Sequence, residues 1–309
     1  MPSEEESKQQ IGQVQVRRED PSLHYDILGK IGDGAFSTIF EVRRKSDNKR
    51  CALKFIRVKT DFDRQVVLNE IGIMALCQEN EAILSCFDCF DHLERMWLFL
   101  EMMDGGALTG LIRKRLCFYS EDFVRFVCLK VLQGIKFLHD KHIVHRDIKS
   151  ENILVSSEGA IKLADFGYST QLTQENKNRS SQVGTNSWMA PEMVTGSTRY
   201  GKKIDVWSFG VLLVELATGT PPYQLENQQQ IFYSIVNNPA PELDPTQWSS
   251  QFCHFAKMCL QKNPDDRFSI DQLLSHEWLS DAENLKAVLI HEIKLWQNME
   301  KDPVSFDNI

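Results

Sequence analysis

The feature that most constrains the fold of this chain is a change of hydrophobic period at the Asp-Gly-Gly sequence of residues 104–106. Before it, runs such as "YDILGK", "STIFEV" and "MWLFLEM" are typical of short strands, with turns expected at residues 32–34 and 46–48. One interval, "DRQVVLNEIGIMALC", places Val67, Ile71 and Met74 three and four residues apart, as on one helix face. After the break, "EDFVRFVCLKVLQGIKFLHDKH" and "KKIDVWSFGVLLVELATG" predict long helices. We expect an α+β chain whose small strand-rich part joins a larger helical part through a glycine-bearing hinge.

Composition sets limits on the class of protein. The 309 residues carry a net charge of −8, which argues against nucleic acid as the main partner. No apolar run approaches the length of a membrane span. The opening "MPSEEESKQQ" has no apolar segment of a signal peptide, and a Met-Pro start excludes N-myristoylation. We expect a cytoplasmic protein, with a nuclear location also open.

The eight cysteines are scattered along the chain. Cys86 and Cys89 match C-x-x-C, but no second pair completes a zinc site. We expect buried, reduced thiols.

Both ends differ from the middle. Residues 1–22 are polar and predict a flexible tail. Residues 280–309 predict a helical extension, in which five apolar residues share one face: Leu285, Val288, Leu289, Ile293 and Trp296. We expect this helix to pack on the large part, although autoinhibition or partner recruitment stays open. Its mixed charges do not favour a calmodulin target.

The stretch "IGDGAFSTIF" begins a G-x-G-x-x-G pattern with Gly32 and Gly34, but Ser37 stands at the third position. Alone, it fits a strand–turn–strand equally well. Its weight comes from "CALK", which puts Lys54 on the next strand, and from Glu70 on the following helix, where a carboxylate could orient that lysine.

Three further motifs follow in order: "HRDIKSEN" at residues 145–152, "DFG" at 165–167 and "APE" at 190–192. Together with the preceding elements they resemble the protein-kinase signature over residues 25–279. The resemblance implies a bilobal kinase fold over residues 23–279 that binds Mg-ATP between its lobes. The small lobe would span about 23–101, the hinge about 101–105 and the large lobe about 106–279.

The resemblance also implies roles for individual residues. Asp147 would accept the proton of the substrate hydroxyl, and Lys149 would neutralise the transferred phosphoryl group. Lys54, oriented by Glu70, would bind the α- and β-phosphates. The magnesium ligands would be Asn152 and Asp165.

The resemblance implies an apolar adenine slot beneath the glycine loop, with Leu100 at the gatekeeper position and the hinge following it. Since many active kinases carry a small residue at the third loop position, we interpret the loop as a nucleotide loop despite its serine. The nucleotide-binding residues would be Ile31, Gly32, Asp33, Gly34, Ala35, Phe36, Ser37, Thr38, Ile39, Ala52, Lys54, Leu100, Glu101, Met103 and Leu154.

Two structural pairs are also expected from the family. Glu192 would form a buried ion pair with Arg267, and Asp205 would brace the loop that carries the catalytic aspartate.

Lys149 in the catalytic loop is typical of serine/threonine kinases. The surrounding motifs, including "GTNSWMAPE" and "YGKKIDVWSFGV", most resemble STE-group kinases of the PAK and sterile-twenty type. Asn186 departs from the proline usual there, and no motif for binding a small GTPase is recognisable in the tail. Three alternatives stay open: a pseudokinase scaffold, a calmodulin-dependent kinase, which "GAFS" and "SHEWL" resemble, and a dual-specificity kinase.

Arg146 precedes Asp147, an arrangement that commonly requires a phosphate on the activation segment. The resemblance makes Ser181 the first candidate phosphosite and Ser180 the second, modified by an upstream kinase or by trans-autophosphorylation. Thr185 would contact the substrate site.

Glu151 and Glu215 match positions that, in basophilic kinases, bind an arginine two residues before the acceptor. Ala107 stands where such kinases recognise an arginine one step further out. We therefore predict protein substrates with an arginine near the phosphorylated residue, in intracellular signalling.

Overall fold

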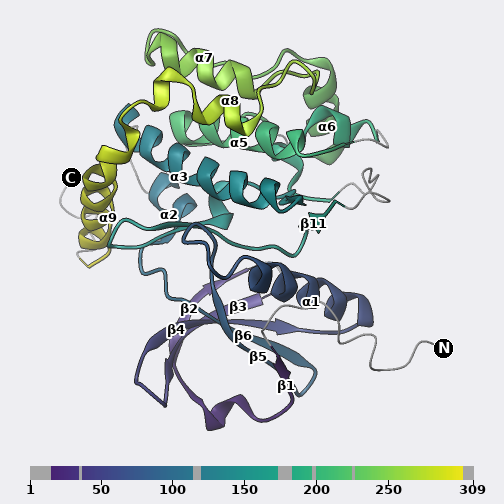
Figure 1. Ribbon diagram of the computed structural model, residues 1–309, viewed down its shortest axis with the longest axis vertical. Coiled ribbons are helices and arrows are strands. Elements are labelled where there is room, and N and C mark those ends of the chain that lie inside the picture. The colour runs from purple at the N-terminus through teal and green to yellow at the C-terminus, as the bar shows by residue number, and fades with distance from the viewer. Residues whose placement is uncertain are drawn as a thin grey trace. The chain divides into compact units, whose positions relative to one another are not determined.

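The computed structural model describes residues 15–34, 37–113, 120–172, 183–196, 200–224 and 227–301. They form two compact units: unit 1 comprises the chain up to residue 103 together with 165–169, and unit 2 comprises 104–164 and the chain from 170 onward. Unit 1 is rich in strands and contains helix α1, whereas unit 2 is mostly helical (Figure 1). This division confirms the predicted α+β class.

Unit 1 is built on a six-stranded sheet in the order β1-β5-β6-β4-β3-β2. All neighbours pair antiparallel except β1, which runs parallel to β5. Helix α1 (Asp61–Leu76) packs beside β5 and begins at a capping box, in which Thr60 and Asp63 satisfy each other's backbone N–H groups. The strands are β1 (Val16–Arg17), β2 (Tyr25–Asp33), β3 (Ser37–Arg44), β4 (Arg50–Arg57), β5 (Cys86–His92) and β6 (Arg95–Leu100).

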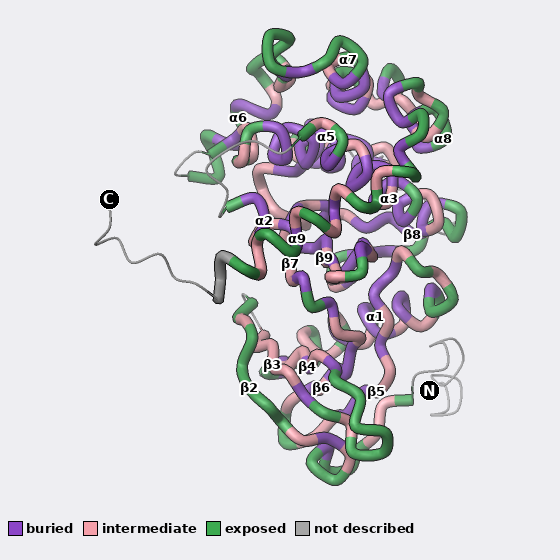
Figure 2. The backbone as a smooth tube through the Cα atoms, turned by 90° about the vertical axis from the view of Figure 1, so that its left-hand side faces the viewer, coloured by how far each residue is buried: buried purple, intermediate pink, exposed green. Residues whose placement is uncertain are grey.

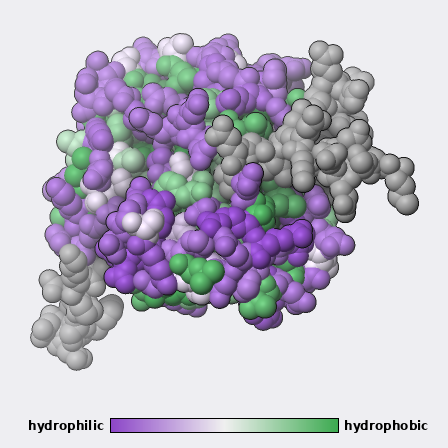
Figure 3. Space-filling view, turned by 60° about the horizontal axis from the view of Figure 1, so that its bottom comes forward, coloured by the Kyte–Doolittle hydropathy of each residue, from purple (hydrophilic) through white to green (hydrophobic). Residues whose placement is uncertain are grey.

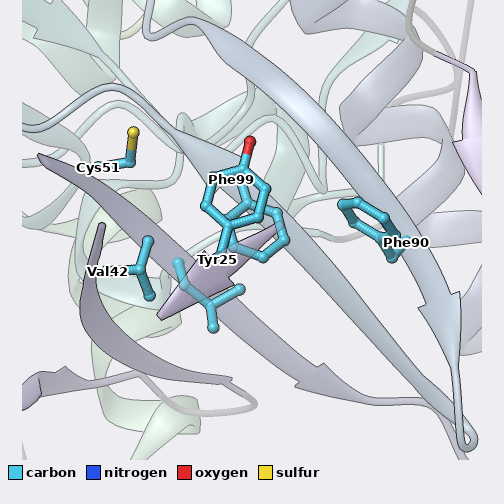
Figure 4. Packing of buried hydrophobic residues seen from close by; sticks show 6 residues of the cluster. Tyr25, Val42, Cys51, Phe90 and Phe99 are labelled. Atoms are coloured by element: carbon cyan, nitrogen blue, oxygen red, sulfur yellow. The ribbon is translucent and has the colours of Figure 1, made fainter. Parts of the chain in front are cut away.

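An aromatic cluster fills one side of this sheet (Figure 4). The rings of Tyr25 and Phe99 stack with centroids 3.7 Å apart, and Phe90 meets Phe99 edge-on. The Tyr25 hydroxyl donates a 2.6 Å hydrogen bond to Asp88, so its polar end is satisfied while the ring is buried.

The prediction of a flexible tail over residues 1–22 is wrong for its last part. Val16 and Arg17 add a strand to the edge of the sheet, opposite Cys89 and Phe90. The Arg17 guanidinium lies 4.7 Å from the centre of the Phe90 ring, which gives this polar segment a packing partner. Composition alone could not reveal that contact. The rest of the predicted tail, residues 1–14, lies outside the described residues.

Unit 2 surrounds helix α5, which is buried on nearly every side (Figure 2). An apolar surface all round is typical of a helix at the centre of a large unit. The short strands of unit 2 form two small sheets, β10-β9-β7 and β11-β8. The strands are β7 (Gly106–Ala107), β8 (Ile143–Val144), β9 (Ile153–Val155), β10 (Ile161–Leu163) and β11 (Thr170–Gln171). The described α-helices are α2 (Leu108–Arg113), α3 (Glu121–Asp140), α4 (Pro191–Val194), α5 (Lys203–Thr218), α6 (Gln228–Asn237), α7 (Ser250–Cys259), α8 (Ile270–Leu274) and α9 (Lys286–Lys301).

Helix α9 packs on unit 2 through the face that its sequence pattern predicts. Leu289 and Ile293 are fully buried. The Trp296 ring covers Gly110, at which an added Cβ would lie 3.8 Å from the indole, and the Gln297 side chain donates to the Asp104 carbonyl at 3.2 Å. The predicted helical extension starts with a 3-10 turn (Ala282–Leu285), so the α-helix proper begins at Lys286.

The face of the molecule that Figure 3 shows is mainly hydrophilic, with hydrophobic residues in small separate groups. Such scattered exposure is ordinary. None of the described helices is long and apolar enough to cross a membrane. Cys86 and Cys89, like most described cysteines, are buried, and burial raises the pKa of both thiols.

Candidate active site

An ion-paired lysine lies in the interior of unit 1. Lys54 on β4 donates to Glu70 of α1 at 2.7 Å and to Asp165 at 3.1 Å. The Lys54 side chain is 16% exposed and that of Glu70 is 5% exposed. Although burial alone would lower the pKa of Lys54, the two carboxylates outweigh it and raise the pKa, so the lysine stays cationic. The sequence motifs predicted this pair of Lys54 and Glu70, and the structure forms it.

The segment that carries Asp165 is fastened to α1. The Asn69 side chain donates to the Ser169 carbonyl at 3.0 Å. A Cβ at Gly167 would lie 3.5 Å from Val66, so the backbone passes close to the helix. Asp165 itself has a φ of 62°, a left-handed conformation that costs a residue with a side chain about 1–2 kcal/mol. The strain persists because both flanking contacts hold the backbone.

The predicted nucleotide residues of unit 1 line up on adjacent strands. Ile39 is opposite Gly32 and Lys54, and Ala52 is opposite Leu100. Gly34 donates its N–H to the Ser37 carbonyl at 2.7 Å, and a Cβ at Gly34 would meet the Ser37 hydroxyl at 2.7 Å. A side chain at the second glycine position would therefore require the Ser37 hydroxyl to change rotamer. Ala35 and Phe36 lie outside the described residues.

The end of β6 is anchored within unit 1. Glu101 donates its N–H to the Ser85 carbonyl, and its carboxylate accepts the Ser85 N–H at 2.7 Å. Met103 is the last residue of this part of unit 1 and is largely buried. In unit 2, Leu154 lies on β9 opposite Ala107 and Lys162.

A second polar cluster surrounds Asp147 in unit 2. Its Oδ1 accepts hydrogen bonds from the Thr185 hydroxyl at 2.7 Å and the Thr185 N–H at 3.0 Å. Its Oδ2 lies 2.9 Å from Lys149 Nζ and accepts from the Asn152 amide at 2.8 Å. Lys149 also donates to the Thr185 hydroxyl at 2.6 Å. One carboxylate thus binds an ammonium, an amide and a hydroxyl, which holds both of its oxygens in fixed positions.

Asp205 of α5 braces the loop of this cluster, as the resemblance implies. Its fully buried carboxylate accepts the backbone N–H groups of His145 and Arg146 at 2.9 and 2.8 Å, and it pairs with His139 at 2.8 Å. Burial alone would raise the pKa of Asp205, but the hydrogen bond from His139 and the backbone donors hold it below its usual value. These bonds also support the positive φ of 67° at Arg146.

The two carboxylates expected to bind a substrate arginine lie together in unit 2. Ser150 donates to Glu215 at 2.5 Å, and Arg113 lies 3.4 Å from Glu151. Within the described part of the chain, Oε2 of Glu151 and Oε2 of Glu215 are buried without a hydrogen-bond partner. Burial, with the charge of Glu151 beside it, raises the pKa of Glu215 to about 7. An incoming cation would satisfy both oxygens.

Two other predictions concern the large helical part. Arg267, which is 1% exposed, forms the expected bidentate ion pair with Glu192 at 2.9 and 3.2 Å. The candidate phosphosites Ser180 and Ser181 lie outside the described residues. Arg146 donates to the Tyr200 hydroxyl at 3.2 Å.

Sequence reasoning missed several residues that shape the site. Gly184 has a φ of 115°, and a Cβ there would lie 2.5 Å from the Arg146 carbonyl, so only glycine fits beside the Asp147 loop. Ser150 donates to Glu215, and Thr109 in turn contacts the Ser150 hydroxyl. Gly184 precedes Thr185 directly, and Ser150 lies inside "HRDIKSEN". Their positions within these motifs could have identified them as residues of the site.

The predicted magnesium ligands fit a hard cation by chemistry. Asn152 uses its amide N–H₂ on the Asp147 carboxylate and carbonyl, which directs its amide oxygen away from that residue. Asp165 is 46% exposed. Amide and carboxylate oxygens are the donors that magnesium prefers. No group of three or more His, Cys, Asp or Glu side chains suited to a metal occurs among the described residues.

The chain matches the family described as "Protein kinase domain" over residues 25–279. It is 36% identical over 278 residues to the serine/threonine-protein kinase PAK 1 of Mus musculus, covering 89% of this chain and 50% of that protein. It is 36% identical over 277 residues to the serine/threonine-protein kinase STE20 of Saccharomyces cerevisiae (89% and 29%). It is 35% identical over 287 residues to the human serine/threonine-protein kinase 10 (90% and 30%). The chain spans half or less of the length of these relatives, and their names agree with the predicted PAK- and sterile-twenty-like subgroup.

Proposed function

Because this chain belongs to the protein kinase domain family, we propose that it transfers the γ-phosphoryl group of ATP to serine or threonine hydroxyl groups of other proteins. The observation that carries the proposal is the Asp147 cluster. Its carboxylate is held in a fixed position by Lys149, Thr185 and Asn152, so a substrate hydroxyl displaces one of these donors when it delivers its proton.

In the proposed reaction the substrate hydroxyl oxygen forms a bond to the γ-phosphorus, and the bond from that phosphorus to the β–γ bridging oxygen breaks, releasing ADP. Asp147 receives the hydroxyl proton, and Lys149 neutralises the transferred group. Lys54, held by Glu70, binds the α- and β-phosphates. Asn152 and Asp165 would hold magnesium, which when bound neutralises phosphate charge.

We assign Glu151 and Glu215 to recognition of an arginine two residues before the acceptor. Two buried oxygens with no hydrogen-bond partner in the described structure support this assignment, because a guanidinium donates to two acceptors at once. Thr185 would border the acceptor residue.

The test is phosphate incorporation from Mg-ATP into a serine/threonine peptide library. We expect incorporation by the native chain, none by Asp165→Asn or Asp147→Asn, and native rates for Asp265→Asn, an exposed aspartate that serves as control. Peptides with an arginine two residues before the acceptor should be preferred. Nucleotide binding without any transfer, even after treatment with an upstream kinase, would instead support a scaffold.

We further propose that phosphorylation of Ser181, or of Ser180, activates the chain through Arg146. A dianionic phosphate is a strong partner for a guanidinium adjoining the catalytic aspartate. Ser181→Ala should lower the rate strongly relative to phosphorylated native protein. This mode of control would be contradicted if native protein, shown by mass spectrometry to be unphosphorylated, had the same rate as the phosphorylated native protein.

A further inference from the structure

A hollow of about 660 Å³ opens in unit 1, away from the Lys54 ion pair. It lies where β4 leads into α1 and where β5 turns back into β6. We call it the basic hollow, after its four cationic side chains. Its lining comprises residues 57–61, Arg64 and residues 93–95.

The residues that line the basic hollow carry more positive than negative charge, although the Asp63 carboxylate adjoins it and accepts the Lys59 N–H. Its cations are Arg57, Lys59, Arg64 and Arg95, and its anions are Asp61 and Glu94. Arg64 pairs with Asp91 on β5. None of the other three cations forms an ion pair with any residue that the structure describes. This excess stands out in a chain of net charge −8.

The register of the sheet concentrates that charge. Arg57 on β4 is directly opposite Arg95 on β6. Like charges at opposite cross-strand positions are destabilising. The Arg95 guanidinium lies 4.9 Å from the centre of the Phe55 ring, which orients it but does not neutralise it. An anion between the two arginines would remove the repulsion.

The groups available to bind an anion are the cationic side chains rather than the backbone N–H groups at the start of α1. The Thr60 and Asp63 capping box already occupies N–H groups of the first turn. An anionic ligand would therefore be bound by guanidinium and ammonium groups, in which arginine favours carboxylate and phosphate oxygens.

Apolar side chains at the rim indicate what kind of ligand fits. The two-residue turn after β5 holds Leu93 and Glu94 at φ of 51° and 56°, and Leu93 is 75% exposed. Phe62 follows Asp61 in the sequence, is not part of the lining itself, and is 76% exposed. The two rim carboxylates would repel a surface of continuous negative charge, such as nucleic acid or an anionic bilayer. A peptide can place its acidic groups between them.

We propose that the basic hollow is a docking site for a segment of a partner protein that combines acidic side chains with an apolar residue. The acidic groups bind Arg57, Lys59 and Arg95, and the apolar residue packs against Leu93 or Phe62. Docking there is independent of the phosphoryl-transfer site.

The test uses a short fluorescein-labelled peptide of glutamates interrupted by one phenylalanine, with binding followed by fluorescence anisotropy at low salt. The variant carries Arg57→Glu and Lys59→Glu. It should fold, because a carboxylate opposite Arg95 replaces a repulsive pair by an attractive one. We expect its affinity to fall at least about tenfold, since two attractive contacts become repulsive.

The control is Lys257→Glu, which reverses one charge at an exposed lysine of α7, far along the sequence from the basic hollow. It should bind the peptide like the native chain, and all three proteins should phosphorylate a substrate peptide at equal rates. Absence of binding by the native chain, an equal loss in Lys257→Glu, or full binding by the double variant would overturn the proposal. So would tighter binding of an oligonucleotide or a phosphatidylserine vesicle that the double variant abolishes.

Discussion

Among single residues, Gly184 controls the position of the catalytic loop most directly. Its φ of 115° is costly for any residue with a side chain, and the space where a Cβ would go is taken by the Arg146 carbonyl. The carboxylate of Asp147 is the next nearest group, at 3.9 Å from that Cβ position. A methyl group there must displace the loop that holds the proton acceptor.

We therefore predict that Gly184→Ala lowers kcat by about a hundredfold, because a shift near 1 Å in the catalytic groups has that effect. The matched control is Gly201→Ala, where a Cβ meets no atom within 4 Å. Steady-state kinetics on one peptide would compare them. Equal kcat values for the two variants would show that the loop tolerates the displacement.

A single residue, Glu215, is also expected to make peptide binding depend on pH. Since the pKa of this carboxyl is raised to about 7, the group gains its charge as pH rises through neutrality. KM for a peptide with the arginine should fall by up to about tenfold between pH 6 and 8, whereas KM for the matched alanine peptide should not. For stability the sign is opposite: the contribution of this group is complete below its unfolded value of 4.5 and is lost as pH rises toward 7. Glu215→Gln should remove the pH dependence of KM.

At the scale of elements, α9 shows how an amphipathic pattern becomes a packed helix. The sequence predicted its buried face, and Leu289 and Ile293 are indeed fully buried. The surface that receives it depends on Gly159, where a Cβ would lie 2.9 Å from both Ile290 and Lys286, whereas a Cβ at Gly106 or Gly110 would make ordinary contact with Trp296.

Leu289→Ala should lower the free energy of unfolding by about 2–5 kcal/mol, since it removes a buried side chain and leaves a cavity. Leu295→Ala, on the same helix but 43% exposed, should cost far less. Urea unfolding followed by circular dichroism measures both. Similar values for the two variants would mean that α9 contributes little to the stability of unit 2.

Elements also show where sequence reasoning succeeds. The Lys54–Glu70 and Glu192–Arg267 pairs and the bracing role of Asp205 were expected because the motifs around these residues resemble those of a known family, in which such contacts occur. Strand β1 was missed, because two residues of a polar segment acquire strand structure only by pairing with β5. The basic hollow was missed for a similar reason: its cations come from two stretches of sequence, 57–64 and 93–95, that meet only in the folded unit.

At the scale of the whole molecule, the boundary between the units does not follow the sequence. Residues 165–169 belong to unit 1 although both flanking segments belong to unit 2. The bonds of Asp165 to Lys54 and of Ser169 to Asn69 account for this assignment. A substitution in α1 should therefore alter the stability of residues 165–169, nearly a hundred residues away in sequence.

We predict that Glu70→Gln speeds amide hydrogen exchange in α1 and in residues 165–169, because the mutation removes the charge that holds Lys54. Peptides from α5 should exchange as in the native chain, which makes them the internal reference. Mass spectrometry after proteolysis provides the measurement. Unchanged exchange in residues 165–169 would indicate that the Asn69 contact alone retains them.

The buried cysteines have a practical consequence. Cys51, Cys86, Cys89, Cys128 and Cys259 are at most 2% exposed, and burial raises the pKa of each thiol. Only a solvent-exposed thiolate reacts with an alkylating reagent, so these sulfurs become reactive when the fold around them opens. The rate of alkylation at each of these sulfurs would thus report opening separately in the sheet and in the helices. The cysteines act as built-in probes of local stability, distributed over both units.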